Sequence, residues 1–256
     1  MSTSFGKVIP VTGLLNGFPG TPSRQGVPVI TSRRVLSTAA HVVSFGEAVV
    51  AISDATGGTF QSIRDFVATL ANIPLLTTQF AGIAVREVHS HLTYPVGVTP
   101  GTDVIGSYAV GAIMDALEQG TVTVLITHGT PGSDGAVYAR VAASASLTAT
   151  SVGDLEAAAD TVSTTGTCAS GTSLAVNSGT GIVAGQIVTG AGIADGTYVA
   201  AVSGTTVTLS QAVTSALSTT AVVFASTVKL PYVVFKTGSL DANGVAEILI
   251  KVRNAA

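Results

Sequence analysis

The stretch from Val141 to Val228 constrains the fold most, because it contains no lysine or arginine and consists largely of Thr, Ser, Ala, Gly and Val. Its apolar and polar residues alternate in short runs separated by glycine-containing turns, which is the pattern of half-buried strands. Such closely spaced strands predict a small β-sandwich or barrel. The expected strands are Ser173–Asn177, Gln186–Thr189, Thr197–Val202, Thr206–Ser210 and Ala221–Ala225.

The sequence on either side of this stretch also predicts strands, but it contains lysines and arginines. Residues 16–28 hold prolines at 19, 22 and 28 among three glycines, so we expect an extended arm there. The Asn243-Gly244 pair predicts a tight turn between the last two strands. Enrichment in β-branched residues predicts strands at Pro28–Ser32, Ala48–Ser53, Phe80–Val88, Val122–Thr127, Ala136–Ala142, Tyr232–Lys236 and Val245–Val252.

Two further segments have helical character. Thr59–Leu70 places Phe60, Ile63 and Phe66 with other apolar residues at helical spacing after a Gly-Gly break, which predicts a short helix. Tyr108–Gln119 runs directly into a β-branched run. The pattern there is compatible with either a helix or a strand.

A glycine-rich sequence at 190–196, Gly-Ala-Gly-Ile-Ala-Asp-Gly, is similar to a phosphate-binding loop. A dinucleotide-binding loop needs a following helix whose N-terminal N–H groups hold the pyrophosphate. The residues that follow are β-branched and lead into another glycine turn, and the region has no basic side chain. We therefore interpret the glycines as corners with positive φ in a connection between short strands.

Candidate catalytic and metal-binding residues are few. His89 and His91 would point to the same face of a strand, with Glu87 as a third possible metal ligand, but polar residues at an exposed strand end give the same pattern. Cys168 is the single cysteine, has no basic neighbour and is expected to be a small, partly buried residue. No Gly-x-Ser-x-Gly nucleophile motif is present. We predict a protein that is not an enzyme and that binds no cofactor or metal.

Composition restricts the partners. Only 10% of the residues are charged and the net charge is −3, so the chain presents no electrostatic field for nucleic acid or an anionic membrane. No window of about 20 residues is continuously apolar. The first residues lack the charged and apolar regions of a secretion signal, which predicts synthesis in a cytoplasm. Arg24, Arg33 and Arg34 form the only small basic cluster of the sequence. They lie beside the extended arm and are our candidates for contact with a partner. Two solvated arginines at a strand end would give the same pattern.

Several segments together resemble the structural cement, or decoration, proteins of tailed bacteriophage heads. They occur in the order of that family and are NGFPGTPSRQG (16–26), FAGIAVREV (80–88), GAVYARVAA (135–143) and LPYVVFKTGSLDANGVAEILI (230–250). The resemblance implies a β-rich homo-oligomer that binds the outside of a capsid shell across junctions between coat subunits. It also favours a strand for Tyr108–Gln119. In similar proteins the segment after residues 153–160 leads quickly into the final hairpin, whereas here a module intervenes that itself resembles a small β unit of phage surface proteins.

The predicted fold class is therefore all-β, with a β-sandwich or barrel-like base domain and a second small β domain inserted before the C-terminal hairpin. The base domain would comprise 1–157 plus 227–256, and the inserted domain 158–226. The expected partners are the major capsid protein and further copies of the chain, as a dimer or trimer, on the exterior of the virion. The alternative is a head- or tail-associated adhesin that recognises host surface glycans, for which the inserted stretch offers only Tyr198 and Phe224 as aromatic platforms.

Overall fold

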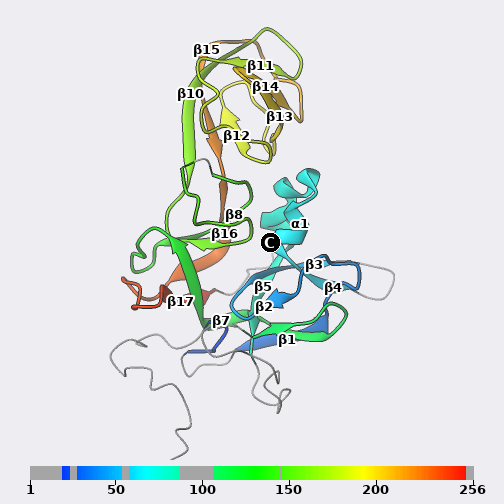
Figure 1. Cartoon of the computed structure of the whole chain (residues 1–256), viewed down its shortest axis with the longest axis vertical. Coiled ribbons are helices and arrows are strands. Elements are labelled where there is room, and N and C mark those ends of the chain that lie inside the picture. Colours follow the sequence, from blue (N-terminus) through cyan, green and yellow to red (C-terminus); the bar gives the residue numbers. More distant parts are fainter. Residues whose placement is uncertain (1–18, 24–27, 54–57, 87–105, 145, 252–256) are drawn as a thin grey trace, which may run out of the picture.

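The computed structural model describes residues 19–23, 28–53, 58–86, 106–144 and 146–251. Strands make up 49% of the structure and helices 7%, so the all-β prediction is confirmed. Figure 1 shows two β units arranged along the long axis of the molecule. We call residues 161–225 the module and the other described residues the base.

A nine-stranded sheet forms most of the base, in the order β17-β16-β8-β9-β7-β5-β3-β4, with β1 paired to β7. The predicted strands of the flanking sequence fall within it, with ends that differ by a few residues. Its strands are β1 (Val29–Arg34), β3 (Ala48–Ile52), β4 (Thr59–Ser62), β5 (Phe80–Val85), β7 (Ile113–His128), β8 (Ala136–Arg140), β9 (Leu155–Glu156), β16 (Thr227–Phe235) and β17 (Val245–Ile250).

The sixteen-residue strand β7 organises the base. Its second half pairs with β9 and β17, and because β17 continues through β16 and β8 back to β9, five strands close into a barrel. The barrel core includes Val122, Val124, Phe235 and Ile248, which are fully buried. The first half of β7 pairs with β1 and β5 in a second, more open part of the sheet. The two parts therefore share one strand as a common support.

The described part of the predicted arm, residues 19–23, begins with a turn at 19–20 and then lies along β7. The Gly20 N–H donates to the Thr123 carbonyl at 2.7 Å, and Pro22 forms a bridge with Val122. Gly20 has φ +80°, and a Cβ there would lie 2.7 Å from the Cβ of Phe45. Only glycine fits this conformation and this close approach. Nearby, a two-stranded ribbon pairs β2 (Val43–Ser44) with β6 (Ser107–Tyr108).

The helical prediction for Thr59–Leu70 is correct only in its second half. Residues 59–62 form β4, which pairs with β3, and the helix α1 spans Ile63–Val67. Backbone pairing with β3 takes precedence over the helical spacing of the apolar side chains, and the Ser62 hydroxyl then caps α1 by accepting the Arg64 N–H at 3.1 Å. Helices η1 (Leu70–Leu75) and α2 (Leu76–Gln79) follow. The strand favoured for Tyr108–Gln119 is confirmed from Ile113 onward.

The module is a six-stranded sheet in the order β12-β15-β10-β11-β14-β13. A bridge between Ile187 and Tyr198 joins the two ends of this order, and the core packs around Leu174, Val207 and Phe224. The strands are β10 (Thr161–Cys168), β11 (Ser173–Val176), β12 (Ile187–Gly190), β13 (Val199–Ser203), β14 (Thr206–Leu209) and β15 (Leu217–Ala225).

The glycine-rich sequence at 190–196 connects β12 to β13, as the strands on either side of it predict. Gly192 has φ +82° and Gly196 has φ +75°, so these two glycines take the positive φ values expected for corners. β10 was not expected as a strand, because Thr, Ser and Gly fill most of it. The module follows β9 and precedes β16 and β17, which is the place in the chain where the sequence predicts a second β unit.

Candidate interaction surfaces

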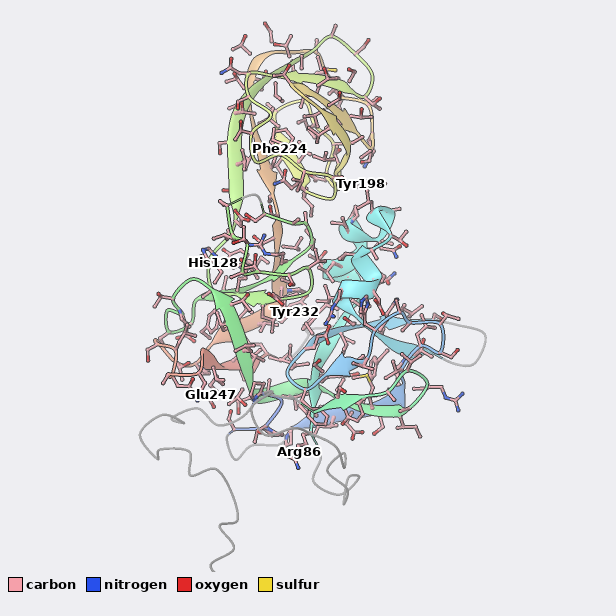
Figure 2. All side chains as sticks on the ribbon, viewed as in Figure 1. Arg86, His128, Tyr198, Phe224, Tyr232 and Glu247 are labelled. Carbon is pink, nitrogen blue, oxygen red and sulfur yellow. The ribbon has the colours of Figure 1, made fainter. Side chains whose placement is uncertain are left out.

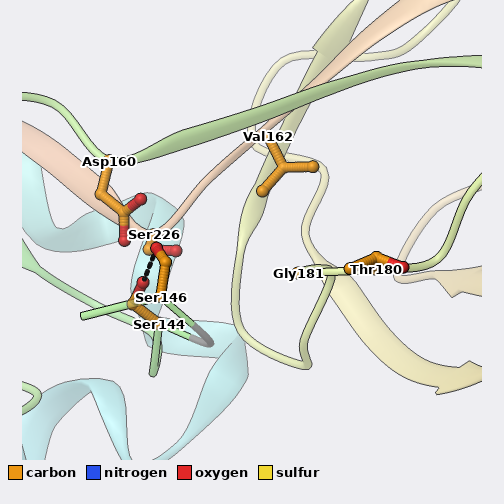
Figure 3. Close-up of a pocket in the computed structure, with 7 residues that line it drawn as sticks. All are labelled: Ser144, Ser146, Asp160, Val162, Thr180, Gly181 and Ser226. Atoms are coloured by element: carbon orange, nitrogen blue, oxygen red, sulfur yellow. Dashed lines mark hydrogen bonds between the residues drawn. The ribbon is translucent and has the colours of Figure 1, made fainter. Parts of the chain in front are cut away.

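The chain passes from the base into the module and returns to the base at adjacent points. Asp160 precedes β10 and Ser226 follows β15, and the Ser226 N–H donates to the Asp160 carbonyl at 2.9 Å. A cavity of about 240 Å³ lies at this junction (Figure 3). Its lining contains hydroxyl groups and one carboxylate but no histidine or cysteine, and the residues are Ser144, Ser146, Asp160, Val162, Thr180, Gly181 and Ser226. The one carboxylate, that of Asp160, is held in an ion pair with Arg140 and is therefore not free to activate a nucleophile.

A buried ion cluster holds the junction from the side of the base. The guanidinium of Arg140, on β8, is fully buried and binds both carboxylate oxygens of the fully buried Glu156, one of them at 3.0 Å. The Arg140 Nη1 also donates to Asp160 at 2.9 Å. His128 Nδ1 lies 3.3 Å from the Glu156 carboxylate. Arg140 therefore links the barrel to the residue from which the module departs.

Charge and burial compete at Asp160. Burial raises the pKa of its carboxyl, but hydrogen bonds from Arg140, Ser144 and Ser226 and the Arg140 charge outweigh burial, so the pKa lies below the ordinary value. Burial likewise lowers the pKa of Arg140, yet its bonds to Glu156 and Asp160 raise the net value. Both side chains are therefore held in their charged forms.

The module also touches the helical segment of the base. A Cβ built on Gly185 would lie 3.3 Å from Leu70, and one on Gly196 would lie 3.2 Å from Pro74. Ile187 packs against the same core as Leu70. Together with the ion cluster, this lateral contact supports the module at two places.

Among the described residues, the large exposed apolar side chains lie on the base and not on the module. Seven large hydrophobic side chains are exposed among the described residues, and all belong to the base: Val29, Val42, Leu75, Val110, Ile113, Leu125 and Tyr232. The module instead exposes Ser, Thr, Ala and Gly, and Asp195 is its only charged residue. Phe224 is fully buried inside it (Figure 2). The two units therefore present surfaces of different chemistry.

Three of the exposed apolar positions gather near the start of β7. Ile113 is 70% exposed and pairs with Arg34 of β1, while Val110 lies in the preceding turn. Val42 adjoins the β2–β6 ribbon that leads into this turn. We call Arg34, Val42, Val110 and Ile113 the Ile113 patch. Figure 1 shows β1 at the end of the long axis opposite the module.

The predicted contact arginines do not form one patch. Arg33 and Arg34 are neighbours on β1, so their side chains point to opposite faces of the strand. The Arg33 guanidinium lies over the Phe60 ring at 5.5 Å, whereas Arg34 is exposed beside Ile113. Arg24 lies outside the described residues. A role of these arginines in binding stays a prediction.

Of the other candidate site residues, the structure describes only some. Cys168 is buried, more fully than the partly buried residue that the sequence predicts. His89, His91 and Glu87 lie outside the described residues, and within the described ranges no three His, Cys, Asp or Glu side chains gather to hold a metal ion. None of the described helices is long and apolar enough to cross a membrane.

A comparison with protein families gives a match to the XM1 gp53 minor capsid protein over residues 6–176. The chain belongs to this family. A search of curated proteins finds no match. The matched segment runs through the first strands of the base and ends with β11 of the module. The protein is thus a structural, capsid-associated component of a phage virion.

Sequence reasoning missed the ion cluster of this minor capsid protein. Arg140 is the one charged residue of the largely apolar segment GAVYARVAA, and a charged residue inside a buried strand is a usable signal for an ion pair. Glu156 lies in GDLEAAAD, which also contains two aspartates, so it stands out less in the sequence. Their pairing was not predictable, because β8 and β9 are joined only by the folded sheet.

Proposed function

We propose that this minor capsid protein is a cement protein, which binds the outer surface of the shell through its base and stabilises junctions between coat subunits. The supporting observation is the division of surface chemistry, since every exposed large hydrophobic side chain among the described residues belongs to the base. Exposed apolar groups beside an exposed arginine favour a protein interface. The Ile113 patch is the candidate contact, because Arg34 and Ile113 belong to the pair of β1 and β7, and Figure 1 shows β1 at the end of the molecule opposite the module.

The proposal assigns the module to the solvent side of the shell. Residues 158–226 would fold as a separate domain, because the ends of the segment are hydrogen-bonded to each other and its strands form their own sheet and core. A protein that binds only the assembled shell stabilises it by mass action. The chain would act as a dimer or trimer with the major capsid protein as its partner, without covalent chemistry.

Glycan adhesion, the alternative raised by the sequence, receives less support. Glycan sites commonly present aromatic rings beside polar groups. In the module Phe224 is fully buried and Tyr198 is half-buried, so few rings are available for stacking.

Heads assembled without this chain provide the test. Purified wild-type protein should bind them saturably and raise the temperature at which they break open. Ile113→Glu combined with Arg34→Glu should weaken binding at least about tenfold, because the double variant places two negative charges where an apolar and a basic side chain made contact.

The matched control is Thr208→Glu, which adds a charge to an exposed strand position of the module. Surface substitutions of this kind change stability little, so each variant should unfold at the wild-type temperature. Absence of wild-type binding to the heads would reject the cement function. An equal loss of binding for Thr208→Glu would reject the assignment of the module to the solvent side of the shell.

A further inference from the structure

Tyr232 is both strained and exposed. It lies in a register shift of β16, between Lys229 and Val234, and has φ +62°. A bulky residue with positive φ is a genuine outlier, and such conformations persist only where the surrounding structure imposes them. Tyr232 is nevertheless 49% exposed. Figure 2 shows this residue on the base.

The neighbouring backbone holds Tyr232 in place. Leu230 and Val233 are buried on either side of it, and the Lys251 N–H donates to the Tyr232 carbonyl at 2.8 Å. The phenol hydroxyl makes no hydrogen bond with any part of the chain that the structure describes. A hydrogen bond of the hydroxyl therefore does not account for a tyrosine at this position, where glycine would satisfy the backbone and half of the side chain is exposed.

Two lysines flank the bulge. Lys229 and Lys251 are exposed, and neither ammonium forms an ion pair with a described carboxylate. Lys236, by contrast, pairs with Asp134 at 3.4 Å. Lys229 precedes the register shift and the Lys251 N–H binds the Tyr232 carbonyl, so both lysines belong to the segment around the exposed ring. An exposed aromatic ring with unpaired cations beside it is suited to a protein surface that carries carboxylates.

We infer that Tyr232, Lys229 and Lys251, the Tyr232 bulge, form a second contact of the base with the shell, against a carboxylate-bearing surface of a coat subunit. This inference rests on the proposed function. The ring supplies apolar area at small entropic cost, and the lysines supply charge complementarity.

The test measures binding of full-length variants to heads assembled without this chain. Tyr232→Gly should weaken binding at least about tenfold while leaving the unfolding temperature unchanged or raised, because glycine relieves the strain. Thr219→Gly is the matched control, since Thr219 has φ +53° and is exposed on the module. It should not change binding. Lys229→Gln with Lys251→Gln should weaken binding and reduce its dependence on salt.

Each outcome decides a separate question. Wild-type binding that Tyr232→Gly does not weaken would overturn the second contact and leave the cement function standing. No wild-type binding would reject the cement function itself. Self-association of the free chain that Tyr232→Gly abolishes would show that the occupant is a second copy, and the assignment to the shell would then be wrong.

Discussion

Replacement of Arg140 by methionine tests the ion cluster at the junction. Methionine keeps most of the aliphatic volume, so the main effect is loss of the charge that faces Glu156 and Asp160. Glu156 is fully buried and, among the described residues, would keep His128 as its one ion-pair partner. The Asp160 side chain is 12% exposed and has some access to water. Breaking a buried ion pair by removing one partner costs about 3–5 kcal/mol. We expect a loss in this range for Arg140→Met.

Urea unfolding followed by circular dichroism measures this loss, since the chain has no tryptophan to report by fluorescence. Arg64→Met is the control, because Arg64 is partly exposed and lies 3.5 Å from Glu47, and its loss should cost no more than about 1 kcal/mol. Adding Glu156→Met to Arg140→Met should recover much of the loss, since an apolar pair replaces the uncompensated charge. Equal costs for Arg140→Met and Arg64→Met would refute the reasoning.

Two further predictions concern pH and packing. The pKa of the Asp160 carboxyl in the folded protein lies below its ordinary value of 3.8. The charged carboxylate therefore stabilises the fold above pH 3.8, and this stabilisation is lost as the pH falls through the folded-state pKa. The loss of unfolding free energy caused by Asp160→Asn, measured by urea unfolding, should shrink between about pH 7 and about pH 3. Gly82→Ala should destabilise the base by about 3 kcal/mol in the same assay, because its Cβ would overlap the Leu117 carbonyl on β7; a wild-type midpoint would contradict the close approach of β5 and β7.

Local chemistry accounts for the features that the sequence predicted well. The Asn243-Gly244 turn follows from glycine at a positive φ, with Gly244 at +76° and its N–H bonded to the Asp241 carbonyl. The strands of the module likewise follow from alternation and glycine punctuation, which act within a few residues. β10 escaped this reasoning because its small polar residues carry little apolar signal, and its pairing with β15 supplies the stability instead.

What the sequence determined by itself was the all-β class and the turns, because these depend on short-range backbone preferences and on composition. The tertiary structure decided where side chains from distant segments meet. It divided Arg33 from Arg34 by the alternation of β1, turned residues 59–62 into a strand against β3, and brought Arg140 to Glu156 and Asp160. These outcomes depend on long-range pairing and burial, whose free energy exists only when the whole sheet is assembled.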